Sequence, residues 1–299
     1  VLKNVNFSGA TLSGVEFSSI DSIKGSTNFK GANLSGSSFY HVNVREADSS
    51  LFEDATINGV FFNQVGGLNG EILEKTGSYK KGDLSGLLIN GYVSSHTDLS
   101  GMDFSGMNLQ GMGASFVNLS NANFTGADLR GSGSFFTDTS GAIYKNTIMS
   151  NGEINNITFN SESDVLVVRD YKINAKIAEN AELSAGSIEL LDGAKLEVMD
   201  DVTVTISDEL SISFDGEISG VNDILLMGDN STIVMAGYES NEEAQAAFIG
   251  LFKDSEGNSV DWAPESVASF VTAAIPEPST YAAIFGALAI AFAAYRRRK

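Results

Sequence analysis

The chain has 299 residues, of which 31 are glycine and 3 are proline. It carries 18 basic and 38 acidic residues, and this net charge of −20 disfavours the phosphate contacts of nucleic-acid binding. Cysteine is absent, which excludes disulfides, cysteine-ligated zinc and thiol catalysis. Only His41 and His96 are available for the acid–base and metal chemistry that most often uses histidine. We therefore expect a protein that is not an enzyme and has no catalytic residue, metal or cofactor.

The charge separates the chain into three segments. Residues 1–150 carry 9 basic and 13 acidic residues (net −4), and residues 151–270 carry 5 and 24 (net −19). Residues 271–299 carry 4 and 1 (net +3), which brings the total to −20. An acidic central segment between a nearly neutral first half and a basic C-terminus indicates separate structural units.

The first half of the chain repeats every five residues. A small or apolar residue stands two positions before many of the large apolar ones, Asn or Asp commonly stands between them, and Ser-Gly or Thr-Gly often follows. The large residues are Phe7, Leu12, Phe17, Leu34 and Phe39, then Phe52, Ile57 and Phe62 with a shifted phase, and Leu84, Ile89, Leu99, Phe104, Leu109, Leu119, Phe124 and Leu129 in one phase. A period of five fits neither a helix nor a flat strand. It predicts a coil that turns a corner every five residues and shares its core with stacked neighbours.

These repeats resemble those of the pentapeptide-repeat family, as in the segments 32–36 (Ala-Asn-Leu-Ser-Gly) and 127–131 (Ala-Asp-Leu-Arg-Gly). The resemblance implies a right-handed, quadrilateral β-helix with four repeats in each coil. We expect one repeat block over residues 1–65, a helical or loop insertion over residues 66–81 and a second block over residues 82–150. At a spacing of four repeats, Leu99 stacks on Leu119, Phe104 on Phe124 and Leu109 on Leu129, whereas Ser94 and Ala114 stand where large residues are expected.

From residue 151 onward, alternating apolar and polar residues predict short strands. The runs are 164–169, 195–199, 202–207, 210–214, 223–227 and 232–235, with Val202, Val204 and Ile206 on one face. We expect an acidic, strand-rich domain over residues 151–238, either a further β-solenoid, which we favour, or a small sandwich. The aspartates in its turns are more simply a solvated acidic face than a calcium site, because the glycine-rich calcium repeat is missing.

One helix is predicted between residues 239 and 275. Ser240 and Glu243 fit a capping box at its start. The apolar residues that follow at helical spacing are Ala244, Ala247, Phe248, Leu251 and Phe252. We expect this helix to cover the open end of the solenoid, whose last coil would otherwise expose its core.

Residues 276–299 combine a proline-rich motif, an apolar run and a basic end. In order, they contain Pro276, Glu277 and Pro278, then Tyr281, the apolar run 282–294 and Tyr295, then Arg296, Arg297, Arg298 and Lys299. The flanking tyrosines are typical of a membrane interface, and the basic cluster is typical of a cytoplasmic end. The pattern predicts a C-terminal transmembrane helix, shorter than the usual ~20 residues, with the body of the protein outside.

This order closely resembles the PEP-CTERM sorting tail of bacterial surface proteins. The resemblance implies export by the Sec machinery, insertion into the membrane through the C-terminal helix and processing by an exosortase that recognises Pro276, Glu277 and Pro278. It implies delivery to the cell envelope, and it allows release to the extracellular matrix. The chain opens Val1-Leu2-Lys3-Asn4 without a signal peptide, so we expect that the sequence is a fragment or has lost its leader.

These observations predict an exported structural protein of the cell surface or extracellular matrix. One alternative is a polysaccharide-binding surface protein of the biofilm matrix, which would need carboxylates with basic partners or an aromatic platform. The available residues are Arg169, Lys172, Lys176, Lys195, Lys253 and Trp262, the sole tryptophan. A DNA-mimicking pentapeptide-repeat inhibitor is disfavoured, because the repeats themselves carry a net charge of only −4.

Overall fold

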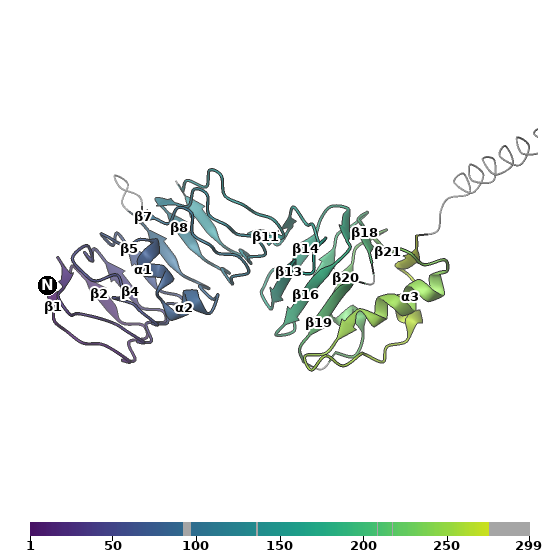
Figure 1. Cartoon of the computed structure of the whole chain (residues 1–299), viewed down its shortest axis with the longest axis horizontal. Coiled ribbons are helices and arrows are strands. Elements are labelled where there is room, and N and C mark those ends of the chain that lie inside the picture. Colours follow the sequence, from purple (N-terminus) through teal and green to yellow (C-terminus); the bar gives the residue numbers. More distant parts are fainter. Residues whose placement is uncertain (92–96, 136, 208, 217, 275–299) are drawn as a thin grey trace, which may run out of the picture.

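The computed structural model describes residues 1–91, 97–135, 137–207, 209–216 and 218–274. Over these residues the chain winds into two stacks of β-coils that follow one another along the molecule (Figure 1). We call the coils from β1 to β11 the first stack and the coils from β13 to β23 the second stack. Successive coils contribute strands to shared, mostly parallel sheets, so the described chain is an all-β solenoid with a few short helices.

The largest sheet of the first stack has six parallel strands in sequence order. These are β2 (Glu16–Ser18), β4 (Ser38–Tyr40), β5 (Phe61–Asn63), β6 (Leu88–Asn90), β8 (Gly113–Ser115) and β10 (Gly133–Phe135). Two parallel pairs form separate sheets, β1 (Leu2–Lys3) with β3 (Ile23–Lys24) and β7 (Thr97–Asp98) with β9 (Val117–Asn118). Because each coil hydrogen-bonds to the next, apolar side chains at matching positions stack in ladders inside the solenoid.

From Thr97 onward the second repeat block has the predicted coil length of four repeats, whereas its first coil is one repeat longer, because Asp83 pairs with Asn108 and Ile89 with Ala114. Asp103 pairs with Asn123, and the adjacent rings of Phe104 and Phe124 are stacked with centroids 5.2 Å apart. Tyr144 continues this ladder at 5.2 Å from Phe124. The predicted stacking of the large apolar residues is thus confirmed in this block. Of the two expected irregularities, Ala114 is buried in β8, whereas Ser94 lies outside the described residues.

The first repeat block has longer coils than the resemblance implied. Phe17 pairs with Phe39, and Phe39 pairs with Phe62. Both steps are longer than four repeats, so the expected coil length is wrong here. Phe7 and Phe17 lie ten residues apart in the sequence, which is two repeats. The next phenylalanine of the core, Phe29, follows Phe17 by twelve residues, which is not a whole number of repeats. The pentapeptide phase therefore shifts within the coil, while the phenylalanines still stack.

The polar residue inside each repeat closes a corner of the coil. Asp103 accepts a hydrogen bond from the backbone N–H of Ser105 at 3.1 Å, and Asn118 accepts one from Ser120 at 3.0 Å. Such a bond two residues along is the Asx turn that favours Asn and Asp at corners. The same side chains also join coils, because the Asn123 amide donates to the Asp103 carboxylate at 3.0 Å. The Asn or Asp preference of the repeat is thus explained by two hydrogen bonds.

The insertion between the repeat blocks contains two short helices, α1 (Gly70–Glu74) and α2 (Gly77–Lys80). Asn69 caps α1 by accepting from the Ile72 N–H, and Thr76 caps α2 by accepting from the Tyr79 N–H. Ile72 and Leu73 are buried in the core of the first stack. Both helices lie within the expected insertion, and they lengthen the coil between β5 and β6 without interrupting the pairing of these strands.

The second stack consists of three parallel sheets, one for each side of a coil. The first holds β13 (Val165–Arg169), β16 (Gly186–Leu191), β19 (Leu210–Phe214) and β22 (Phe252–Lys253). The second holds β14 (Ala175–Ile177), β17 (Leu196–Val198) and β20 (Leu225–Met227). The third holds β15 (Ala181–Leu183), β18 (Thr203–Ile206), β21 (Thr232–Met235) and β23 (Val271–Ala273), and two 3₁₀ turns, Val221–Asp223 and Pro264–Val267, complete the coils. A continued solenoid, rather than a sandwich, is the observed fold.

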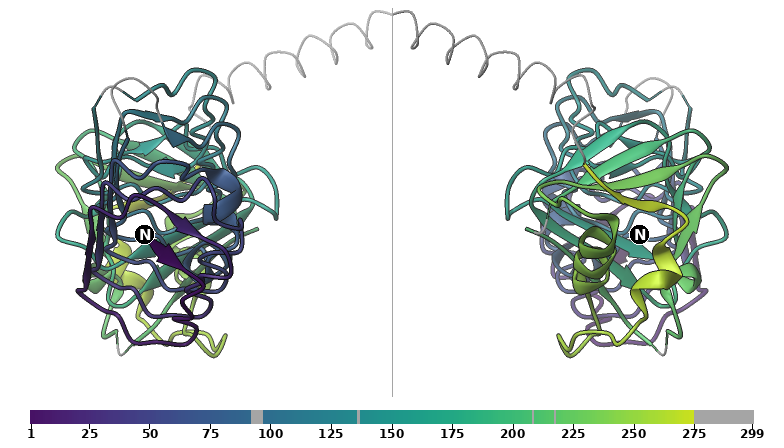
Figure 2. Two further views of the ribbon diagram at one scale, coloured as in Figure 1. Left: turned by 90° about the vertical axis from the view of Figure 1, so that its left-hand side faces the viewer. Right: turned by 90° about the vertical axis from the view of Figure 1, so that its right-hand side faces the viewer.

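Helix α3 (Asn241–Gly250) lies against the last coil of the second stack, as Figure 2 shows in its right-hand view. The Ser240 hydroxyl accepts from the Glu243 N–H at 3.3 Å, which confirms the predicted cap. Ala244 and Phe248 are fully buried beneath the helix. The predicted helix is too long by two residues, because the helix ends at Gly250 and Phe252 already belongs to β22.

A short antiparallel hairpin of β11 (Thr147–Ile148) and β12 (Ile154–Asn155) joins the two stacks. Asp128 pairs with Ile148, Ile148 with Ile154, and Glu153 with Lys176, so one ladder continues through the hairpin. The side chains of Asp128, Ile148 and Ile154 lie on the same side of this ladder. Asp128 points away from the first core, whereas Ile148 and Ile154 belong to the second core. The two cores therefore lie on opposite sides of this ladder.

Candidate functional site

The predicted sorting and anchor residues lie outside the described residues. They are Pro276, Glu277, Pro278, Tyr281, Tyr295, Arg296, Arg297, Arg298 and Lys299. Up to residue 274, where the description ends, no helix has the length and apolar character needed to cross a membrane. The sorting tail and its helix therefore stay predictions.

Of the two histidines, His41 lies among the described residues. His41 is an exposed corner residue after β4, with a left-handed backbone φ of 52°, and His96 lies outside the described residues. Among the residues with described positions, no group of three His, Asp or Glu side chains is placed to hold a metal ion. Chemistry at a ligand must therefore be sought in grooves and at the junction of the stacks.

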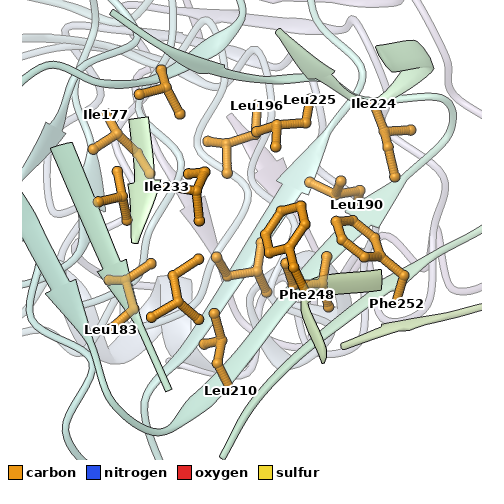
Figure 3. A pocket seen from close by; sticks show the side chains of 15 residues that line it. Ile177, Leu183, Leu190, Leu196, Leu210, Ile224, Leu225, Ile233, Phe248 and Phe252 are labelled. Atoms are coloured by element: carbon orange, nitrogen blue, oxygen red, sulfur yellow. The ribbon is translucent and has the colours of Figure 1, made fainter. Parts of the chain in front are cut away.

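The interior of the second stack is core rather than a ligand cavity. Figure 3 shows the side chains that line it, all of them hydrocarbon, including Leu190, Ile233 and Phe248. The free space among them is about 20 Å³, room for about one water molecule. A ligand would have to displace packed side chains to enter, so this interior carries stability.

The junction between the stacks contains a fully buried ion pair. Arg130 is 1% exposed and Asp128 is 0% exposed. The guanidinium holds the carboxylate with two bonds, Nε to Oδ1 at 2.9 Å and Nη2 to Oδ2 at 2.6 Å. The Gln110 amide donates to the same carboxylate at 2.8 Å. Both charges are thus compensated inside the protein, as buried charges must be.

Arg130 also connects the first stack to the second. Its Nη1 donates to the Ile173 carbonyl at 2.7 Å, and its Nη2 donates to the Arg169 carbonyl at 2.5 Å. The Tyr171 ring lies 5.7 Å from the guanidinium carbon, and its hydroxyl occupies the space that a Cβ on Gly131 would need. Gly131 also has a φ of +69°, a left-handed conformation that favours glycine. Both the space taken by Tyr171 and this backbone conformation therefore require glycine at position 131.

A second ion pair joins the stacks at Asp164. Lys145, from the first stack, lies 2.5 Å from the carboxylate, which also accepts from the N–H groups of Asn160 and Ser161. Burial opposes ionisation of Asp164, but these hydrogen bonds and the lysine charge outweigh it, so the pKa of Asp164 lies below its usual value. Together with Arg130, this pair holds the two stacks in one orientation.

The low pKa of Asp164 makes part of the stability dependent on pH. Because the folded pKa lies below the ordinary 3.8, the ion pair contributes fully above pH 3.8, and this contribution is lost as the pH falls through the folded pKa. We expect Asp164→Asn to lower the free energy of unfolding at pH 7 by about 1–3 kcal/mol. The variant should also lose less stability than the parent on acidification, as measured by urea unfolding at pH 7 and at pH 3. A matched control is Glu182→Gln, which removes an exposed charge on β15; an equal change in both variants would contradict the role of Asp164.

A groove at the C-terminal end of the second stack has an aromatic floor. Its volume is about 600 Å³, within the range of small-molecule sites. The indole of Trp262 stacks on the Phe214 ring with centroids 5.6 Å apart and an interplanar angle of 16°, and Phe252 lies 5.3 Å away. Phe214 and Phe252 are 5% and 1% exposed, whereas Trp262 is only partly buried. Trp262 is therefore the aromatic surface that this groove presents to a ligand.

The groove is also lined by residues of polar turns, among them Ser219, which is held by Asp223, and Asp254. On one side, Ser219 donates its N–H and its hydroxyl to Asp223 at 3.1 and 2.7 Å. On the other side, the Asn258 amide and backbone N–H donate to Asp254, and these bonds hold the pKa of the Asp254 carboxyl below its usual range. Asp261 lines the groove as an exposed residue next to the tryptophan. The groove therefore combines an aromatic face with permanent negative charge.

The sequence interpretation noted Trp262 but did not place it beside particular carboxylates. Lys253 lies next to the groove, where its ammonium donates to the Ser259 hydroxyl at 2.7 Å. Arg169 and Lys172 are at the junction instead, on either side of Tyr171. The signal that points to the groove is the pair of turn sequences around Asp254 and Ser219, which flank the partly buried Trp262 once the coils are stacked.

Comparison with known proteins supports the repeat assignment. Residues 26–48 and 95–131 match the family model described as Pentapeptide repeats, in eight copies. Both matched ranges lie in the first stack, and together with the stacked coils they support a pentapeptide-repeat β-helix. No curated protein matches the sequence of this chain.

Proposed function

We propose that this pentapeptide-repeat solenoid is an exported structural protein of the cell surface or extracellular matrix, delivered by a PEP-CTERM tail at residues 276–299. The observation that carries the proposal is the order of Pro276-Glu277-Pro278, the apolar run 282–294 and the basic end 296–299. The proposal includes the right-handed, quadrilateral winding of the first stack and a membrane-spanning C-terminal helix. Its partners are the Sec machinery, an exosortase and the membrane.

The body of the protein suits a rigid structural role. Two stacks with separate cores are connected by a ladder through β11 and β12 and by the ion pairs of Arg130 and Lys145. These contacts across the junction oppose bending between the stacks, as a structural role requires. Pentapeptide-repeat solenoids are in general structural or interaction proteins rather than enzymes, which agrees with this proposal.

The sorting proposal is tested by expressing the chain behind a signal peptide in a host that has an exosortase. We expect mass spectrometry to find a product that lacks the residues after the Pro-Glu-Pro motif, located outside the inner membrane. In a variant with alanine at Pro276, Glu277 and Pro278, we expect the intact chain to stay in the membrane.

Two controls make the outcome specific. Expression in a host without an exosortase should leave the tail intact, and Ser279→Ala, next to the motif, should be processed normally. An intact tail in the presence of the enzyme would overturn the exosortase step while leaving a simple membrane anchor. A chain that stays in the cytoplasm would overturn the export proposal as a whole.

A further inference from the structure

We propose that the groove floored by Trp262 binds an amino-sugar polysaccharide whose free ammonium groups pair with Asp254 and Asp261. The lining residues named here belong to the second stack, so binding at this site can be tested separately from export. Its polymer ligand would attach the acidic end of the solenoid to a matrix that carries positive charge.

The size and floor of the groove fit a short stretch of a sugar chain. A volume of about 600 Å³ is in the range that holds a small ligand with a few polar contacts. The apolar C–H face of a pyranose ring packs well on a flat indole, and Trp262 is held flat by its stacking on Phe214. Because Phe214 is buried in the core, the tryptophan does not need to be ordered when the ligand binds.

The walls supply partners for hydroxyl and ammonium groups. Ser219, Ser259, Asp254 and Asp261 line the groove. Asp254 is fixed by hydrogen bonds from Asn258 and its pKa is lowered, so it keeps its negative charge at neutral pH. A hydrogen bond between an ammonium and a carboxylate is stronger than one between neutral groups.

The charge of the surrounding domain selects among sugars. Residues 151–270 carry a net charge of −19, so a polymer of uronic acids would be repelled on approach. A fully acetylated, neutral sugar would stack on Trp262 but would gain nothing from the carboxylates. The basic side chain nearest the groove in the described chain, Lys253, is tied to Ser259. Among polysaccharides, an amino sugar with free ammonium groups therefore matches this groove best.

Trp262 is the sole tryptophan, so the intrinsic fluorescence of the full chain reports directly on the groove. The probes are a glucosamine tetramer, an N-acetylglucosamine tetramer and a uronic-acid tetramer. We expect the glucosamine tetramer to change the fluorescence saturably and to bind at least about fivefold more tightly than the other two, with weaker binding in high salt. Absence of saturable binding, or tighter binding of the neutral or acidic tetramer, would overturn the proposal.

Variants locate the binding. Asp261→Asn changes an exposed residue, so it should fold normally and weaken glucosamine-tetramer binding about five- to tenfold. Trp262→Ala should abolish binding in calorimetry, which does not need the tryptophan. The control Glu182→Gln removes one charge from β15, outside the groove, and should bind as the parent does. If Glu182→Gln weakens binding as much as Asp261→Asn, the attraction comes from the whole acidic domain and the groove is not the site.

Discussion

Replacement of Arg130 by alanine is expected to lower the free energy of unfolding by about 3–5 kcal/mol. The substitution leaves the Asp128 carboxylate buried at 0% exposure without its cation, which is the costly way to break a buried ion pair. It also removes the hydrogen bonds to the Arg169 and Ile173 carbonyls across the junction. Urea unfolding followed by circular dichroism measures the whole chain, whereas the fluorescence of Trp262 measures the second stack. We expect the whole-chain transition to fall more than the Trp262 transition, because the uncompensated Asp128 carboxylate belongs to the first stack.

Two further variants define what the junction contributes. Lys80→Ala removes a partner of Asp54 from an ion pair at 2.7 Å whose two side chains are about half exposed, and it should cost less than about 1 kcal/mol. Asp128→Asn combined with Arg130→Met removes both buried charges and should recover a large part of the lost stability. A cost below about 1 kcal/mol for Arg130→Ala would contradict the view that this pair joins the stacks.

The stacking of the repeats could be predicted where the period was unbroken. Phe104 and Phe124 share one phase across four repeats, so their ring ladder follows from the sequence alone. In the first block, Phe29 follows Phe17 by more than two repeats, so the period does not predict the coil length. The coil length is shown instead by the hydrogen bonds between successive coils. The insertion with α1 and α2 was recognised because the repeat stops there.

The strands of the second stack were predicted where alternation was strong. Leu210–Phe214 and Thr232–Met235 have the predicted bounds, and the predicted face of Val202, Val204 and Ile206 is buried. Strand β16 (Gly186–Leu191) was not predicted from the sequence. The first of its inward-facing residues is glycine, which gives no apolar signal at that position. Strands β14 and β15 were also not predicted. Their positions are fixed by pairing with neighbouring coils.

The site residues were harder to predict because their environment comes from distant parts of the chain. Arg130 occupies a repeat position that normally faces solvent, and it is buried only because residues 169–173 cover it. Trp262 was an isolated tryptophan until the fold placed it on Phe214, which belongs to an earlier coil. Periodicity predicts contacts between equivalent repeat positions, but neither of these contacts belongs to a repeat.

Replacement of Phe39 by alanine is expected to cost about 3–5 kcal/mol, as is usual for a fully buried phenylalanine. Its ring stacks on Phe17 at 4.7 Å and lies 5.3 Å from Phe62, and its edge contacts with Phe29 and Phe52 are 5.8 and 5.4 Å. The cavity would therefore interrupt two ladders in the middle of the first stack. Differential scanning calorimetry and circular dichroism measure the loss.

The matched control for Phe39→Ala is the next residue of the same strand. Tyr40 points outward from β4, is partly exposed and meets one ring, Phe61, edge-on at 5.3 Å, so Tyr40→Ala should cost about 1 kcal/mol or less. In a solenoid each coil contacts mainly its neighbours, so the Phe39 cavity should destabilise the first stack and leave the Trp262 transition nearly unchanged. A parallel loss at Trp262 would show instead that the junction makes the two stacks one cooperative unit, in which case the ion pair of Arg130 transmits the defect across it.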